Sequence, residues 1–216
     1  MNITRLELLA ADLGAERDFY AGVLELPVRL DSPILEVQVG KTQLLFTESP
    51  QFDGAYHFAF NIPENQFAAA KDWLRQRTPL VVSQSGQDEY NFESWNAHAV
   101  YFFDPAGNVV ELIARHNLSN ASSNPFGGHS LLNVSEISVT TANVLEIVPA
   151  IQLALNVEVY DGPSATFAAV GDEHGLFIVV PEGRAWFPDT GLRAGFYPLT
   201  VHLADGRVWS APLPEA

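Results

Sequence analysis

Glu111 is the main chemical clue in this sequence. It lies in the run Val109-Val110-Glu111-Leu112-Ile113, an apolar segment that is typical of a buried strand. An ionised carboxylate in such a segment is costly to bury unless it is paired, protonated or bound to a cation. The misfit therefore marks a candidate site for metal binding or for acid–base chemistry.

A hairpin must position this carboxylate. The stretch Trp95–Arg115 predicts a strand over Ala99–Phe103, a tight turn over 104–108 and a second strand over Val109–Ala114. Pro105 presets the first corner of the turn, and Asp104 can accept hydrogen bonds from N–H groups further along the turn. Gly107 or Asn108 can adopt the left-handed conformation. Glu111 is thus expected on the second strand of a well-specified hairpin.

The order strand, helix, strand, strand, strand occurs twice before this hairpin ends, which indicates an internal repeat. The first copy is predicted as strand Ile3–Ala10, helix Leu13–Ala21 and strands Val28–Leu30, Leu35–Val39 and Gln43–Thr47. The second is predicted as strand His57–Ile62, helix Glu64–Gln76, strand Leu80–Ser83, a loop over Gln84–Asn96 and the hairpin. A small curled sheet cannot bury its face alone, so the two copies are expected to pair around a shared cleft.

The run Val-Tyr-Phe-Phe-Asp-Pro-Ala-Gly-Asn-Val-Val-Glu-Leu-Ile, residues 100–113, resembles the closing hairpin of the vicinal oxygen chelate superfamily. That superfamily includes glyoxalase I, the fosfomycin- and bleomycin-resistance proteins, methylmalonyl-CoA epimerase and the extradiol dioxygenases. The resemblance covers the first half of the chain well and the second half weakly. It implies an α+β fold in which tandem βαβββ modules pair into a curled mixed sheet around a cleft.

The expected domain organisation follows from the repeat and from composition. Residues 1–116 are predicted to form a glyoxalase-like domain of two modules, 1–50 and 55–116. Residues 117–129 are polar and Gly-rich with one Pro, which is typical of a linker. Residues 130–216 are expected to hold a third, degenerate module followed by one or two C-terminal strands. Its predicted elements are strand Val134–Thr140, helix Ala142–Leu155, which contains Pro149, and strands Val157–Tyr160, Thr166–Val170, Leu176–Val180, Tyr197–Leu203 and Val208–Trp209.

The resemblance also implies four inward positions for a metal, one on the first and one on the last strand of each paired copy. These fall at Arg5, Gln43, His57 and Glu111. His57 and Glu111 are good ligands for a divalent ion such as Fe, Mn, Ni or Zn, and Gln43 is a weak oxygen ligand. Arg5 cannot ligate, because its guanidinium stays protonated.

Two interpretations of this set remain open. Arg5 can replace the ion by forming a bidentate pair with Glu111, which satisfies the buried carboxylate without a metal. Alternatively, a divalent ion is bound through His57, Glu111 and Gln43. The register of the first strand decides between them, because an inward Glu7 in place of Arg5 would favour the metal.

Other candidates lie near the expected cleft. Tyr101 can donate a hydrogen bond to a bound oxyanion, His98 can act as a base near neutral pH, and Trp95 can contact a ligand together with Phe92 and Tyr90. Each residue also has an ordinary structural explanation. Tyr101 can simply be a half-buried aromatic residue of a strand, and the others can simply pack a loop against the protein. In the third copy, Glu136 aligns with Arg5 and His174 precedes the last strand, a pair that coincidence can also explain.

Composition bounds the remaining possibilities. The 216 residues carry a formal net charge of −15 and no cysteine, which argues against nucleic-acid binding and excludes disulfides and Cys-based metal sites. Neither a secretion signal nor a membrane-spanning run is evident, so a cytoplasmic monomer or homodimer without a membrane partner is expected.

Three functions fit these residues. The first is a metal-dependent lyase or isomerase, or a resistance enzyme, acting on a small organic ligand. The second is a metal-free protein that sequesters an aromatic or antibiotic-like ligand. The third is extradiol ring cleavage, which uses two His and one carboxylate, whereas one His occupies the matching positions.

Overall fold

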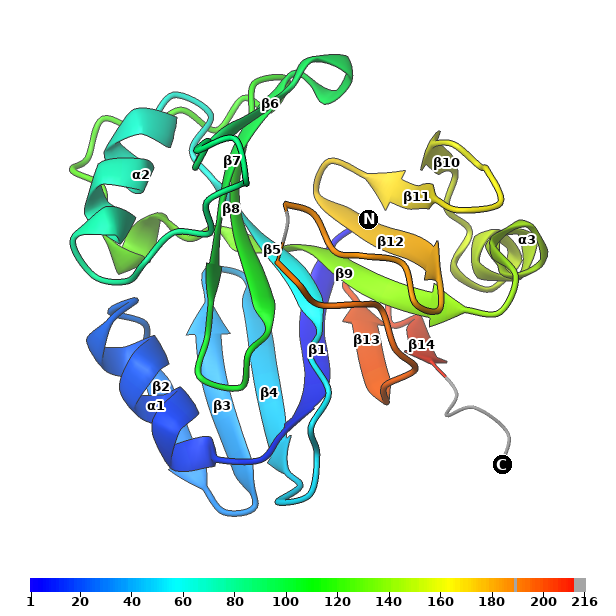
Figure 1. The fold of residues 1–216 in the computed structure, drawn as a ribbon, viewed down its shortest axis with the longest axis horizontal. Coiled ribbons are helices and arrows are strands. Elements are labelled where there is room, and N and C mark those ends of the chain that lie inside the picture. Colours follow the sequence, from blue (N-terminus) through cyan, green and yellow to red (C-terminus); the bar gives the residue numbers. More distant parts are fainter. Residues whose placement is uncertain (189, 212–216) are drawn as a thin grey trace.

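The computed structural model describes residues 1–188 and 190–211, and they form an α+β fold built on two mixed sheets (Figure 1). The six-stranded sheet has the order β14-β13-β1-β4-β3-β2, and the eight-stranded sheet has the order β10-β11-β12-β9-β5-β8-β7-β6. None of the helices in these residues has the length and apolarity needed to cross a membrane.

The elements follow the predicted order, with small shifts at their ends. The first copy contains β1 Ile3–Ala10, α1 Leu13–Gly22, β2 Val28–Asp31, β3 Ile34–Val39 and β4 Thr42–Glu48. The second contains β5 His57–Ile62, α2 Phe67–Arg75, β6 Tyr90–Phe92, β7 Ala97–Phe103 and β8 Val109–Arg115. The rest contains β9 Asn133–Thr141, α3 Val144–Leu155, β10 Val159–Asp161, β11 Ala168–Asp172, β12 Gly175–Pro181, β13 Leu199–Leu203 and β14 Val208–Ala211.

One predicted strand is misplaced. Leu80–Ser83 forms only an isolated bridge between Leu80 and Phe102, and the strand of this copy is β6, inside the segment expected to be a loop. β6 forms because Tyr90–Phe92 pairs antiparallel with β7. That pairing is made by the tertiary arrangement, and the polar residues around it hide the strand from sequence patterns.

Local signals explain why several elements lie where they do. Asp12 caps α1, its carboxylate accepting a hydrogen bond from Ala15 N at 2.9 Å, as an N-cap aspartate does. In β1 the even-numbered residues Leu6, Leu8 and Ala10 are buried, which is the alternation of a strand with one covered face. All six residues of β5 are buried, because this strand lies inside its sheet with both faces covered.

The copies pair differently from the expectation. β5 of the second copy joins β9 antiparallel, so the eight-stranded sheet combines residues 57–115 with residues 133–181. β1 of the first copy joins β13 antiparallel and thereby extends its sheet with the β13–β14 hairpin. The first and second copies therefore do not share one sheet. Strand periodicity shows which faces are buried but not which edges are joined, since edge pairing is a long-range contact.

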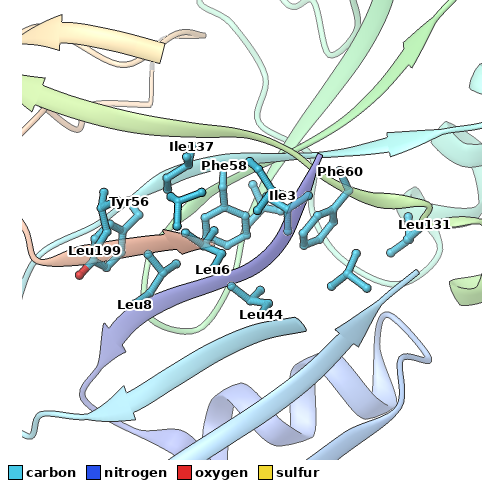
Figure 2. Packing of buried hydrophobic residues seen from close by; sticks show 14 of the residues in the cluster. Ile3, Leu6, Leu8, Leu44, Tyr56, Phe58, Phe60, Leu131, Ile137 and Leu199 are labelled. Carbon is cyan, nitrogen blue, oxygen red and sulfur yellow. The ribbon is translucent and has the colours of Figure 1, made fainter. Parts of the chain in front are cut away.

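The main core lies between the two sheets and extends under the helices. Figure 2 shows Leu6, Leu8 and Leu44 of the six-stranded sheet facing Phe58, Phe60 and Ile137 of the eight-stranded sheet. A second apolar cluster lies on the opposite face of the eight-stranded sheet and includes Ala59, Tyr101, Ile178 and Trp186. That opposite face carries the candidate site.

Candidate functional site

Three neighbouring strands bring three ligating side chains to one place. His57 begins β5, Glu111 lies in the adjacent β8 and Glu136 in the adjacent β9. Ala59, two residues after His57 and so on the same face, pairs with Glu111 on one side and with Glu136 on the other. A methyl group at the centre of this triplet leaves space between the two carboxylates.

The three side chains are buried and close together. Their exposed fractions are 6% for His57, 2% for Glu111 and 3% for Glu136. His57 Nε2 lies 3.7 Å from a carboxylate oxygen of Glu111 and 4.0 Å from one of Glu136. One ligand atom from each residue lies within 4.8 Å of the others. The spacing is suited to three atoms that share one ion.

The orientation of His57 leaves its Nε2 atom available. Nδ1 lies 3.0 Å from the carbonyl oxygen of Val109, which can only accept, so Nδ1 carries the proton. Burial lowers the pKa of His57 to about 4, and the charge of Arg184 acts in the same direction. The imidazole is therefore neutral at pH 7, with the Nε2 lone pair directed at the carboxylates, as a metal-ligating His with a backbone partner would be.

The ionised form of Glu111 is disfavoured by its burial and by Glu136. Burial and the charge of Glu136 raise the pKa of Glu111 well above its usual value, although Arg115 and a hydrogen bond from Tyr101 oppose the shift. Burial also raises the pKa of Glu136, which Arg115 opposes. In the absence of a cation, a proton on Glu111 is the expected way to neutralise the pair.

Arg115 orients Glu136. Its Nη2 donates to Glu136 Oε1, while the other oxygen of that carboxylate, Oε2, is the one nearest His57. Arg115 is fully buried, and its guanidinium lies 5.4 Å from the ring centre of Trp95. One oxygen of Glu136 is thus neutralised by an internal cation, and the other is left for the site.

A pocket of about 310 Å³ opens above the three residues. Its walls are mostly aromatic and carry one arginine, Arg184. Ile178 on β12 corresponds in position to Glu111 on β8. Glu111 lies two residues beyond Val109, the strand partner of His57, and Ile178 lies two residues beyond Leu176, the strand partner of Glu136. The lining residues besides the triplet are Phe92, Ser94, Trp95, Tyr101, Asp161, Phe167, Ile178, Arg184, Trp186 and Phe187.

The structure brings some predicted site residues into this pocket. His57, Glu111, Tyr101 and Trp95 all line it. Tyr101 hydrogen-bonds Glu111, and its ring centre lies 6.2 Å from that of His57. Phe92 also lines the pocket, whereas Tyr90 lies behind it, packed edge-on against Tyr101 at 5.6 Å.

Three predicted site residues lie elsewhere. Arg5 and Gln43 are on β1 and β4 of the six-stranded sheet, where Arg5 Nε contacts Glu7 at 2.9 Å and Gln43 is exposed. The expected Arg5–Glu111 pair therefore does not form, and Gln43 does not join the ligands. His98 lies three residues before Tyr101 on β7, so its side chain is on the opposite face of the sheet. Its Nδ1 lies 2.8 Å from Nε2 of His116, and its ring packs against Phe67 of α2. It points away from the pocket because strand neighbours alternate between faces.

Other members of the site escaped sequence reasoning. Glu136 was considered only as part of a separate site with His174. His174 precedes β12 as expected, but it is exposed and does not line the pocket. The signal for Glu136 is weaker than that for Glu111, because its strand pattern contains Val134, Ile137 and Val139 but also two serines. Arg184, Trp186 and Phe187 come from the segment after β12, where no repeat or periodicity marks a role.

The donor set fits a divalent ion. One neutral imidazole and two carboxylates suit borderline and hard divalent metals, and three protein ligands leave positions open for a substrate. If both buried acids are ionised, their single internal cation leaves one negative charge that such an ion would neutralise. The set does not match the two-His-one-carboxylate arrangement of non-haem iron oxygenases.

Comparison with solved structures identifies the fold. No protein-family model and no curated sequence matches the chain. A Bacillus subtilis protein described as a candidate dioxygenase is similar at a TM-score of 0.58 and 14% identity, over 98% of this chain and 84% of that one. Glyoxalase I from Zea mays is similar at a TM-score of 0.56 and 13% identity, over 97% and 90%. Its V278E mutant is similar at 0.58 and 13%, over 97% and 91%.

Proposed function

Given the fold of the vicinal oxygen chelate superfamily, which these similarities show, we propose that this chain binds a divalent metal ion through His57, Glu111 and Glu136. The observation that carries the proposal is the convergence of three buried ligand atoms at the floor of one pocket, with His57 held in the tautomer that ligation requires. The proposed activity is that of a lyase or isomerase acting on a small oxygen-bearing substrate.

The residues around the triplet have distinct tasks in this proposal. When bound, a divalent ion supplies Lewis-acid polarisation of a substrate oxygen. Val109 holds the His57 ring, and Arg115 holds Glu136. Tyr101 hydrogen-bonds Glu111. Glu111 is the candidate proton acceptor, because burial and the charge of Glu136 raise its pKa well above the usual value of a carboxyl group. The aromatic walls exclude water and strengthen these interactions.

The test is metal content and affinity. As-purified protein is expected to carry about one divalent ion, measured by inductively coupled plasma mass spectrometry, and to bind Mn²⁺ in calorimetric titrations after EDTA treatment. His57→Ala and Glu136→Gln are expected to lose at least about tenfold in affinity, because each removes a ligand. Glu7→Gln and Gln43→Ala serve as controls on the other sheet and are expected to bind normally. Equal Mn²⁺ affinity in the wild type and Glu136→Gln would contradict the proposal.

The aromatic lining of the pocket is also consistent with a second function. The pocket is lined mainly by aromatic side chains, and a proton on Glu111 satisfies the buried acids without an ion. A metal-free protein that sequesters an aromatic ligand is consistent with both observations. The same titration separates the alternatives, because ligand binding that persists in EDTA, in a sample that takes up no ion, supports sequestration.

A further inference from the structure

Arg184 is the one pocket-lining cation among the described residues, and no acidic side chain of that part of the chain lies within ion-pair distance of it. The acidic side chains of the pocket have other hydrogen-bond or ion-pair partners. Arg115 pairs with Glu136, Glu111 is hydrogen-bonded by Tyr101, and Asp161 accepts the indole N–H of Trp95 at 2.7 Å. Among the described residues, Arg184 is therefore a positive charge in a partly enclosed space without a direct ion-pair partner.

The position of Arg184 is well defined. It belongs to the strap, the name used here for residues 182–188 and 190–198 between β12 and β13, drawn in orange across the front of β5 and β9 in Figure 1. Trp186 N donates to Leu192 O at 3.0 Å and Ala194 N donates to Arg184 O at 2.8 Å, so the two arms of the strap pair with each other. The Arg184 guanidinium lies 5.2 Å from the ring centre of Phe167. These contacts hold the side chain at the pocket wall.

The partial burial of the Arg184 guanidinium favours binding of an anionic ligand. Arg184 is half-buried, and desolvation without a nearby acid lowers its pKa. A guanidinium in such a place gains most from a planar anion that it can bind through two parallel N–H···O bonds. The rest of the wall offers apolar contact from Trp186, Phe187 and Phe167. The pocket thus combines a floor of potential ligands, an apolar wall and one arginine that forms no ion pair with the described residues.

We propose that the pocket binds a small carboxylate with an apolar or aromatic body, whose acid group pairs with Arg184 while its body packs against Trp186 and Phe187. A singly charged acid fits better than a dianion, because the floor already holds Glu111 and Glu136. The inference rests on the proposed function only in taking the same pocket as the ligand site. The pairing with Arg184 does not require an ion on the triplet.

The experiment compares mandelate with mandelamide, its neutral isostere, on the full chain in EDTA and again with Mn²⁺, by calorimetry and by quenching of tryptophan fluorescence. The wild type is expected to bind mandelate about ten- to a hundredfold more tightly than mandelamide, as a charge-assisted pair in a desolvated pocket provides. Arg184→Gln is expected to abolish this preference, and Arg184→Lys to restore part of it.

Arg193→Gln is the matched control, because Arg193 lies on the same strap but donates to the carbonyl of Gly183 at 2.7 Å and is exposed outside the pocket. It is expected to keep the full preference. A wild-type preference below about threefold, or one that survives in Arg184→Gln, would overturn the inference. If the wild-type protein binds no Mn²⁺ but keeps the Arg184-dependent preference for mandelate, only the metal proposal is overturned. Failure of the metal proposal can therefore be distinguished from failure of the carboxylate proposal.

Discussion

At the scale of single residues, the most informative feature is a carboxylate in an apolar strand. Glu111 shows it, and so does Glu136, which lies between Ser135 and Ile137 in a strand whose middle is buried. The free-energy cost of burying such a charge is large enough that the surrounding structure must compensate it. In this chain Arg115 compensates Glu136 and a proton or an ion compensates Glu111. Arg115 thus takes part of the role that Arg5 was expected to play.

Removing Arg115 is expected to destabilise the fold. Arg115→Met leaves two buried acids without their internal cation, and breaking a buried pair in this way costs about 3 kcal/mol. The double variant Arg115→Met/Glu136→Met is expected to recover much of that loss, since it removes both charges. Urea unfolding in EDTA measures both. A single variant within about 0.5 kcal/mol of the wild type would show that Arg115 does not balance the site.

At the scale of elements, helix α1 is tied to the turn between β7 and β8 by buried acids. Glu16 accepts a hydrogen bond from Ala106 N at 2.6 Å, and the Tyr20 hydroxyl donates to Asp104 at 3.0 Å. Burial, with the nearby charge of Asp104, raises the pKa of Glu16 to about 9. Burial raises the pKa of Asp104 to about 6. The contact between α1 and the hairpin is therefore most favourable when Glu16 is protonated.

This contact predicts a loss of stability at alkaline pH. Between the unfolded pKa of 4.5 and the folded pKa of about 9, the folded state holds a proton that the unfolded state has released. The free energy of unfolding therefore falls as pH rises through this window, by about 1 kcal/mol per pH unit.

The variant Glu16→Gln tests the source of that loss. It is expected to flatten the decline between pH 6.5 and 9, measured by urea unfolding at each pH. Asp18→Asn is the control, because Asp18 is an exposed acid on the same helix that pairs with Arg17. An unchanged slope in Glu16→Gln would assign the decline to other groups, such as Glu111.

At the scale of the whole molecule, close contacts join the two sheets. The turn between β3 and β4 reaches the segment before β9, where Lys41 N donates to Leu132 O at 2.9 Å. Thr42 adds a bridge, because its hydroxyl donates to Ile3 O at 2.6 Å and accepts from Val134 N at 3.1 Å. Gly40 makes this approach possible. It has a φ of +51°, and a Cβ there would lie 2.0 Å from Leu132 O.

Gly40→Ala is expected to destabilise the protein by about 3 kcal/mol or more, because it combines positive-φ strain with a collision against backbone. Gly206→Ala separates the two effects, since Gly206 has a φ of +89° and open space around it. That variant is expected to cost only about 1 kcal/mol. Thermal and urea unfolding measure both. Similar losses in the two variants would show that the close approach contributes little.

Much of the fold was predictable from local patterns. The strands and helices of the first copy, the β7–β8 hairpin and the α+β fold class follow from apolar periodicity, turn residues and the resemblance carried by residues 100–113. β6 was not predictable in its place, because a three-residue strand among polar residues exists only through its pairing with β7.

By itself, the sequence determined that His57 and Glu111 lie on strands of one copy, since both belong to a continuous repeat unit with clear periodicity. Only the tertiary structure decided that Glu136 and Arg184 complete their pocket and that Arg5 and Gln43 lie outside it. The reason is the antiparallel pairing of β5 with β9. Residues far apart in the chain meet where strand edges join. Edge pairing depends on long-range contacts that local sequence patterns do not encode.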